Sequence, residues 1–444
     1  MAIKNKYSFM FLMAVASVLS TLSWIYLSIN TSSTALSNGR RDNNAFLHKT
    51  GNVPPPAAFT TTQEAKMTDS TKRNTEIKVK ANQTRASTRR AVTKKPIKVP
   101  ATFKPLSFKD LGEVYNQDAP PRQTTCAQSL HNTNDESFKK AFLPNVPLFL
   151  HKDSINMSEW NRLSHYNNPF GFMDYKYDDV MSVLKLIPKP KEPLLLPKPG
   201  SDGCVRCAVV ATGGILNGSK MGKEIDAHDY VFRMNGAVVK GYEEDVGSRT
   251  SVYVHTAHTV TASVILLKKY GYTSVPHDEG IKYVLIPEGM RDFNWLEGLL
   301  KGEKISTGQY INRRPWTYYG GQYNESRFYV LHQDFLRYVR NRFLKSASLN
   351  ASYWALVRPT NGAFTMFLAL HTCDTVNAYG FITEDHKKYS NYYVEKNVKT
   401  NIIFYGNHDY ILEMKLWKKL HDSKIITLYQ RTDSETVTEK LKEH

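Results

Sequence analysis

The sequence predicts an α/β domain with a mainly parallel, Rossmann-type sheet flanked by helices, placed after a membrane segment and a polar stem. Three observations lead to this prediction. From residue 106 onward, short apolar runs alternate with helix-like stretches, which is the pattern of strand–helix–strand units. Residues 7–29 carry no charged side chain, and residues 30–105 are polar and basic. The chain of 444 residues is nevertheless 41% hydrophobic, a composition that excludes wholesale disorder.

The first element is the uncharged stretch at residues 7–29, which follows Lys4 and Lys6. A helix of about 20 apolar residues spans the hydrocarbon core of a bilayer. Because basic residues precede the span, the N-terminus is expected in the cytoplasm. We therefore predict a cytoplasmic tail at residues 1–6 and an uncleaved signal-anchor at 7–29. A cleaved signal peptide is the alternative, since it also begins basic and then turns apolar. Either one places the rest of the chain in the secretory lumen.

Residues 30–105 are predicted to form a disordered stem. Within them, residues 61–105 hold twelve Lys or Arg against three acids and so supply half of the net charge of +18. A segment this polar buries too little surface to offset its chain entropy. The basic excess therefore belongs mainly to the stem, and without a finger, homeodomain or RNP pattern we predict no nucleic-acid partner. Asn-x-Ser/Thr sequons, which suit a lumenal protein, occur at Asn30, Asn82, Asn156, Asn217, Asn324 and Asn350.

Residues 106–444 are predicted to form the folded domain. Bounded apolar runs rich in β-branched residues predict buried strands, and longer periodic stretches predict helices. The expected strands lie at 207–211, 252–254, 283–286, 328–331, 376–381 and 402–405, and the expected helices at 293–300, 334–344, 362–372 and 409–421.

The first of these strands opens onto Gly213 and Gly214. Glycines let backbone N–H groups approach an anion, and a helix N-terminus favours negative charge. The spacing matches neither G-x-G-x-x-G nor G-x-x-x-x-G-K-[ST]. A phosphate cradle and an ordinary tight turn therefore both fit this stretch.

Four segments in sequence order resemble the motifs of animal sialyltransferases. Residues 207–251 are similar to the large sialylmotif, and residues 358–381 are similar to the small one. Tyr392-Tyr393 resembles the short third motif, and His408 with Glu413 fits the His-x4-Glu motif. The flanks at 204–207 and 379–384 look most like N-acetylgalactosaminide alpha-2,6-sialyltransferases of mucin-type O-glycans. The stem is not covered by the resemblance.

The resemblance implies a GT-A-like sialyltransferase fold and assigns His408 as the catalytic general base. The sequence is compatible with that role, because His408 precedes an amphipathic run and so stands where a helix is expected to begin. That end of the helix dipole disfavours imidazolium, and a base must be neutral. Glu413 is five residues further on, off the His408 face of an ideal helix, and we expect it to support the fold rather than orient the base.

The resemblance also implies which residues bind the donor, CMP-sialic acid. Hydroxyl, amide and backbone groups suit its carboxylate and phosphate, and a tyrosine phenol near the phosphate would ease departure of the leaving group. The implied donor-binding residues are Thr212, Asn235, Thr256, Thr360, Asn361, Gly362, Tyr392 and Tyr393. Two of them depart from close relatives, which often carry Asn at position 212 and a hydroxyl residue at position 361.

The chain has four cysteines, at positions 126, 204, 207 and 373. One Cys-x-x-Cys without a second pair is weak evidence for zinc, and lumenal cysteines favour disulfides, for which three connectivities exist. The resemblance implies a Cys207–Cys373 bridge, which leaves Cys126–Cys204. No other metal-ligand spacing stands out, and the family needs no metal, so none is predicted.

The implied activity is transfer of sialic acid, with inversion, to O6 of GalNAc in O-glycosylated glycoproteins, by a single-pass type II enzyme of the Golgi membrane. The acceptor is GalNAc-Ser/Thr, Gal-beta-1,3-GalNAc-Ser/Thr or both. Loops that include residues 301–326 are expected to determine which of these acceptors the enzyme uses. A sialyltransferase of another linkage, such as alpha-2,3 to galactose, is one alternative. A non-catalytic lumenal glycan-binding protein is the other.

Overall fold

The computed structural model describes residues 112–191 and 193–431. The predicted cytoplasmic tail, signal-anchor and stem lie outside these residues. Across the part that is described, none of the helices combines the length and the apolar character needed to cross a bilayer.

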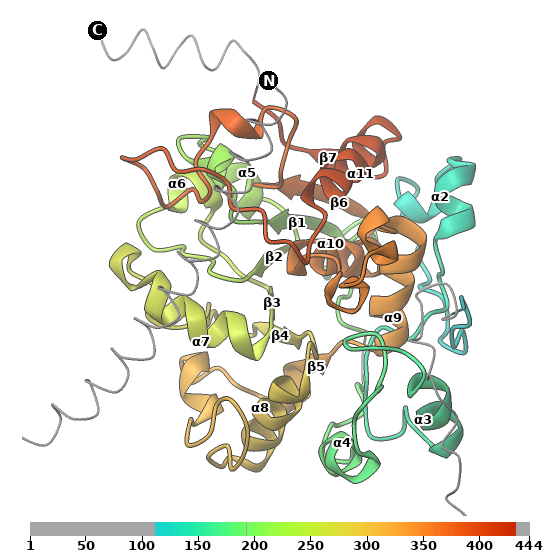
Figure 1. The fold of residues 1–444 in the computed structure, drawn as a ribbon. Helices are drawn as coiled ribbons and strands as arrows, with labels where there is room; N and C mark the ends of the chain where they lie inside the picture. The colour runs from blue at the N-terminus through green and yellow to red at the C-terminus, as the bar shows by residue number, and fades with distance from the viewer. Residues whose placement is uncertain (1–111, 192, 432–444) are drawn as a thin grey trace, which may run out of the picture. The chain divides into compact units, whose positions relative to one another are not determined.

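The described chain folds around one sheet of seven strands in the order β5-β4-β3-β2-β1-β6-β7 (Figure 1). All neighbouring strands pair in parallel, with Val209 opposite Phe232 on one side and Ala378 on the other. The strands are β1 (Arg206–Val210), β2 (Tyr230–Met234), β3 (Val252–His255), β4 (Lys282–Leu285), β5 (Phe328–Val330), β6 (Thr375–Tyr379) and β7 (Thr427–Leu428). The predicted parallel α/β sheet is therefore confirmed.

Helices cover both faces of this sheet. They are α2 (Glu136–Ala141), α3 (Met157–Leu163), α4 (Tyr177–Leu184), α5 (Gly222–Asp226), α6 (Glu243–Val246), α7 (Ala257–Leu266), α8 (Met290–Lys301), α9 (Gln333–Tyr338), α10 (Asn361–Thr372) and α11 (Tyr410–Asp422). Helix α10 is the central one: every residue except Gly362 is buried, and it packs on β1, β2, β3 and β6. A helix that is apolar on all sides is stable only when enclosed in this way.

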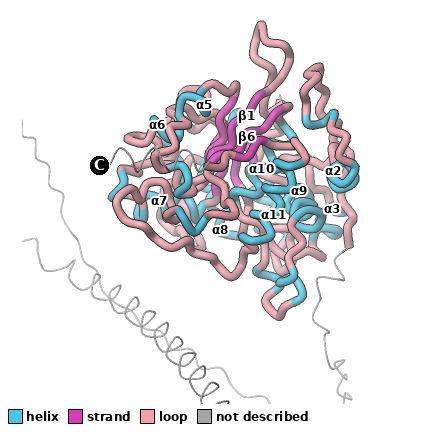
Figure 2. Tube along the Cα trace, turned by 90° about the horizontal axis from the view of Figure 1, so that it is seen from above, coloured by secondary structure: helices cyan, strands magenta, loops and turns pink. Residues whose placement is uncertain are grey.

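Strand β1 divides the core into two layers. Because side chains alternate along a strand, Cys207 and Val209 join the larger apolar cluster, which includes α10, whereas Ala208 and Val210 join a smaller one. The smaller cluster takes in residues of α5 and α6. Figure 2 shows the strands between these two helices and α10.

The structure corrects the sequence-based element assignment in three places. Residues 402–405 are not a strand but an exposed loop, in which Phe404 stacks on Tyr410 with ring centroids 4.9 Å apart. Strands β2 and β7 were not among the predicted strands. In β2 the apolar run is interrupted by Arg233, which is fully buried because its guanidinium donates to Val246 O and to Thr250 Oγ1 (2.7 and 3.2 Å).

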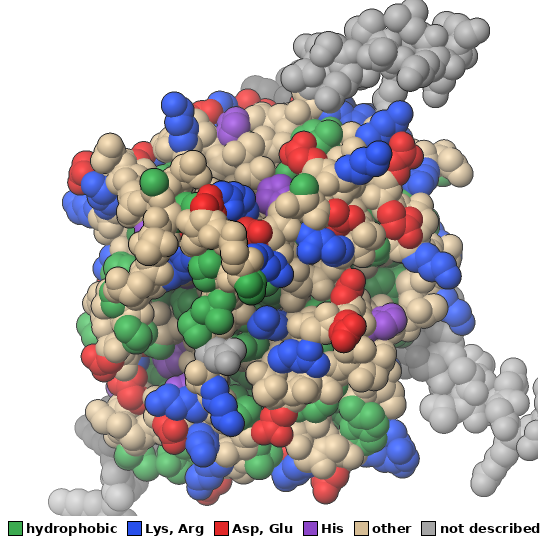
Figure 3. Space-filling view, turned by 180° about the vertical axis from the view of Figure 1, so that it is seen from behind, with side chains coloured by type: hydrophobic (Ala, Val, Ile, Leu, Met, Phe, Trp, Pro, Cys, Tyr) green, Lys and Arg blue, Asp and Glu red, His purple; other side chains and the backbone are tan. Residues whose placement is uncertain are grey.

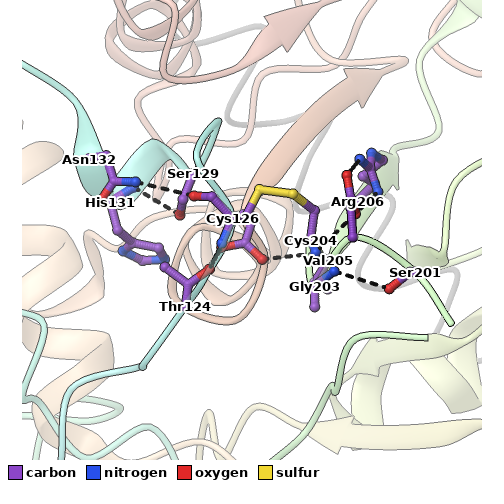
Figure 4. Close-up of a disulfide and its surroundings, with 12 residues drawn as sticks. Thr124, Cys126, Ser129, His131, Asn132, Ser201, Gly203, Cys204, Val205 and Arg206 are labelled. Atoms are coloured by element: carbon purple, nitrogen blue, oxygen red, sulfur yellow. Dashed lines mark hydrogen bonds and ion pairs between the residues drawn. A yellow bond between two sulfur atoms is a disulfide. The ribbon is translucent and has the colours of Figure 1, made fainter. Parts of the chain in front are cut away.

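Both predicted disulfides are formed: Cys207–Cys373, which the resemblance implies, and Cys126–Cys204, which that pairing leaves. The first ties the extended N-terminal segment to the residues just before β1 (Figure 4). The second joins β1 to the residue that follows α10. The first bridge therefore fastens the N-terminal part of the described chain beside β1, and the second fastens β1 itself to the end of α10.

Acidic and basic side chains are mixed on the face of the molecule seen in Figure 3. Lys and Arg do not form an unbroken basic surface there, because Asp and Glu lie among them.

Candidate active site

A cavity of about 510 Å³ lies at the carboxyl edge of the sheet. Its walls come from the segments that follow β1, β2, β3 and β6 and from the loops ahead of α10 and α11. The strand order changes direction at β1: β2 to β5 follow on one side of it, and β6 and β7 lie on the other. In open parallel sheets, ligands bind in the crevice at this type of switch point.

Two glycine-containing loops meet at the base of the cavity, after β1 and after β6. Gly213 N–H donates to Gly380 O at 3.0 Å. A Cβ on Gly213 would stand 2.4 Å from that same oxygen, and Gly380 has φ +73°. Both positions therefore require glycine. The pair Gly213-Gly214 is thus explained at least in part by the close approach of the two loops.

The N-terminus of α10 presents an amide pair to the cavity. Asn361 Nδ2 donates to Asn235 Oδ1 at 2.9 Å. Asn235 has φ +53° and follows β2 directly. Asn361 is only 8% exposed, and its Oδ1 has no hydrogen-bond partner among the described groups. An unpaired buried acceptor is costly, so this oxygen is suited to receive a donor group from a ligand.

Thr360 is the N-cap residue of α10 and is hydrogen-bonded to Glu413 of α11. Its Oγ1 accepts from Ala363 N–H at 3.1 Å and donates to Glu413 Oε2 at 2.7 Å, while Thr360 N–H donates to Glu413 Oε1 at 2.7 Å. Burial raises the pKa of Glu413 to about 7. The carboxyl group therefore positions the amino end of α10, and no hydrogen bond between it and His408 is present in the described region.

His408 lies in the cavity wall, directly ahead of Asp409, the N-cap residue of α11. Its Nδ1 is 2.8 Å from Arg358 O. Because a carbonyl oxygen can only accept, Nδ1 carries the proton and Nε2 of the neutral ring is left as an acceptor. Burial and the Arg358 guanidinium lower the pKa of His408 to about 4. The ring is therefore neutral at pH 7, with the protonation state and tautomer of a general base.

The remaining predicted donor-binding residues take different positions. Thr212, Thr256, Gly362 and Tyr392 line the cavity. Thr256 is also the N-cap of α7, where its hydroxyl accepts from Thr259 N–H at 3.0 Å.

Tyr393 is not part of the cavity lining. It is 2% exposed, and its hydroxyl donates to Val238 O at 2.6 Å, on the side of the sheet packed with α5 and α6. Its phenol is therefore turned away from the cavity in this structure. Of the two adjacent tyrosines, Tyr392 is the one placed to meet a ligand.

Sequence reasoning missed several cavity residues, above all Glu288 and Arg358. Arg358 opens the segment that resembles the small sialylmotif, but no role followed from that position. Glu288 lies after β4 in a stretch, Ile286-Pro287-Glu288, with no recognisable pattern. The structure joins the two side chains in an ion pair at the cavity wall. Only the fold brings them together.

Comparison with known proteins shows the family of the chain. Residues 149–425 match the model of glycosyltransferase family 29 (sialyltransferase). The chain belongs to the sialyltransferase family. It is 44% identical to chicken (Gallus gallus) alpha-N-acetylgalactosaminide alpha-2,6-sialyltransferase 1, across 77% of this chain and 61% of that protein. It is 40% identical to mouse (Mus musculus) alpha-N-acetylgalactosaminide alpha-2,6-sialyltransferase 2, across 74% of this chain and 88% of that one.

A solved structure shares the fold of this sialyltransferase. It is titled a crystal structure of a mammalian sialyltransferase and superposes with a TM-score of 0.51 at 22% identity, over 70% of this chain and all of the other. At that identity the match supports the fold alone. The chain spans less than two thirds of the chicken relative.

Proposed function

We propose that this sialyltransferase moves sialic acid from CMP-sialic acid to O6 of GalNAc in mucin-type O-glycans. The observation that carries the proposal is His408 in the cavity wall: its Nδ1–H is held by a backbone carbonyl, while its Nε2 makes no hydrogen bond within residues 112–191 and 193–431. The relatives at 40–44% identity are named for alpha-2,6 transfer to N-acetylgalactosaminides, which supports GalNAc as the acceptor.

In the proposed reaction, acceptor O6 forms a bond to C2 of sialic acid, and the bond from C2 to the phosphate oxygen breaks. His408 Nε2 takes the O6 proton during attack, because a sugar hydroxyl is a poor nucleophile at neutral pH. CMP leaves with the bonding electrons, and the configuration at C2 is inverted. No enzyme nucleophile is needed, and we propose that no metal takes part.

The donor is proposed to lie over the amino end of α10. Helix N-termini favour anions such as a carboxylate or a phosphate, and α10 begins at the cavity with Asn361 and Gly362. Thr212, Asn235 and Thr256 would line the same space from β1, β2 and β3, and Tyr392 would reach the phosphate. Tyr393 is left out of this set because its hydroxyl is bound to Val238 O.

The acceptor is proposed to enter on the side of the cavity near α7. His258 lines the cavity there, and Tyr310, from the 301–326 segment, places its hydroxyl 3.5 Å from His258 Nδ1. This contact supports the expectation that the 301–326 segment influences acceptor choice.

The enzyme is further proposed to be a type II protein of the Golgi membrane with a lumenal catalytic domain. Its two disulfides suit an oxidising compartment, and residues 7–29 are long enough to anchor it.

Transfer from labelled CMP-sialic acid in the presence of EDTA tests the function. The acceptors are a GalNAc-peptide, a Gal-beta-1,3-GalNAc-peptide and an N-glycan that ends in galactose. Label on the GalNAc peptides, mapped to O6, would support the proposal and rank the two acceptors. Label only on galactose would overturn the linkage. No label on any acceptor, from folded protein that binds CMP, would favour a binding protein.

A further inference from the structure

The loop that carries His408 is fastened to Arg358 at two points. Arg358 N–H donates to Asn407 O at 3.0 Å, and Arg358 O accepts from His408 Nδ1 at 2.8 Å. The same residue therefore fixes the loop and selects the ring tautomer. Any displacement of the Arg358 backbone moves both hydrogen bonds.

The Arg358 side chain is in turn held by Glu288. The two form an ion pair in which the side chains are 17% and 6% exposed, and Glu288 pairs on its other oxygen with Arg291. Glu288 follows β4, Arg358 precedes α10, and His408 precedes α11. Three segments that are distant in sequence thus meet at one residue, Arg358, which bonds to the His408 loop through its backbone and to Glu288 through its side chain.

We propose that Glu288 and Arg358 are positioning residues for His408: their ion pair fixes the Arg358 backbone, whose carbonyl orients the imidazole and selects its tautomer. This inference rests on the proposed function, in which His408 is the base.

A purely structural role accounts poorly for a buried pair at this site. Removing two charges from water is expensive, and replacing a buried ion pair by apolar groups of similar volume is often neutral or stabilising. Arg358 also keeps a buried Nη1 without a hydrogen-bond partner in the part of the chain described. The ion pair between Glu288 and Arg358 is therefore better explained by its effect on the orientation of His408.

The electrostatic surroundings of His408 make Arg358 the main charge acting on it. Burial and the Arg358 guanidinium lower the pKa of His408. The pKa of His258 is lowered by burial first and then by Arg291 and Arg358. The other ionisable groups at this wall have partners or are uncharged at neutral pH. Three of them have partners: Glu413 is hydrogen-bonded to Thr360, Asp409 accepts from Ser346 Oγ at 2.7 Å, and Arg291 pairs with Glu288. Two are uncharged tyrosines: Tyr392 lines the cavity, and the Tyr410 ring meets His408 edge-on with ring centroids 5.7 Å apart.

The test compares R358M, R358K and E288Q in the full-length chain, with E297Q as the control. Glu297 forms a surface ion pair with Lys301 at 2.6 Å and contributes nothing to the cavity lining. Two readouts are used: the pH profile of kcat/KM, and NMR titration of the His408 ring in protein with labelled histidine, assigned by its loss in H408N.

Loss of the positive charge in R358M is expected to raise the His408 titration midpoint by roughly one pH unit. The acidic limb of kcat/KM should move with it. R358K retains the charge, so its midpoint should stay near that of the wild type while kcat falls about tenfold. E288Q should lower kcat about tenfold with little change in KM for CMP-sialic acid, and E297Q should match the wild type.

Equal midpoints in R358M and R358K, measured on variants that melt like the wild type, would overturn the inference. So would full activity in E288Q. If R358M does not fold, the isosteric E288Q variant still decides through its kcat. A wild-type protein that transfers nothing would instead refute the proposed function, and the NMR midpoints would still report whether Arg358 acts on His408.

Discussion

Replacing the buried Glu413 by glutamine is expected to change how stability depends on pH. Burial raises the pKa of Glu413 from 4.5 to about 7. The folded protein therefore holds this proton more tightly than the unfolded chain. The contribution of Glu413 to the free energy of unfolding is then fully present below pH 4.5 and is lost as the pH rises through about 7. The shift corresponds to about 3 kcal/mol, since each pKa unit is worth about 1.4 kcal/mol.

E413Q keeps the shape of the side chain and an oxygen for Thr360 N–H, but it cannot ionise. Between pH 5 and pH 8, the free energy of unfolding of E413Q minus that of the wild type should rise by about 2 to 3 kcal/mol. Asp292, whose pKa burial also raises to about 7, is present in both proteins, so its contribution cancels. Urea unfolding followed by tryptophan fluorescence at four pH values measures the difference, with E297Q as a Glu-to-Gln control. A difference that stays constant with pH would refute the reasoning.

Three other changes are expected to have distinct effects. H408N should lower kcat by about 10²- to 10⁴-fold without weakening CMP binding. In the wild type, the acidic limb of kcat/KM should lie near pH 4, where His408 becomes protonated. An H408N variant that transfers sialic acid normally would exclude His408 as the base. N361A should raise KM for CMP-sialic acid roughly tenfold, and an effect on the acceptor KM alone would place the donor elsewhere. C373S breaks the bridge to Cys207, which closes a loop of 166 residues, so unfolding should require about 5 kcal/mol less; an unchanged melting temperature would argue against that estimate.

Much of the fold could be predicted because local patterns agree with the tertiary structure. The apolar run at 207–211 becomes β1 at Arg206–Val210, and the run at 362–372 becomes the buried helix α10 at Asn361–Thr372. Prediction failed where tertiary contacts override the pattern. Arg233 interrupts the apolar run of β2, and its buried guanidinium donates to Val246 O at the end of α6 and to Arg249 O and Thr250 Oγ1 just beyond it. Residues 402–405 are apolar but exposed, since no neighbouring strand pairs with them.

Only those residues of the candidate site that lie within the family-like motifs could be predicted from the sequence. His408 and Asn361 lie in stretches that resemble family motifs, and both line the cavity. The directions of side chains were not predictable, so nothing in Tyr392-Tyr393 indicated that the second ring turns into the core. Glu288 carries no local signal at all, because its importance arises from an ion pair with a residue 70 positions away in the chain.

The central proposal is that the reaction takes place in the cavity at the carboxyl edge of the sheet. A crystal structure with CMP and a GalNAc-peptide bound together would test this most directly. We predict that the CMP phosphate lies near the amino end of α10 and that GalNAc O6 lies within hydrogen-bond distance of His408 Nε2. CMP bound outside the cavity, or an acceptor whose O6 faces away from His408, would contradict the account.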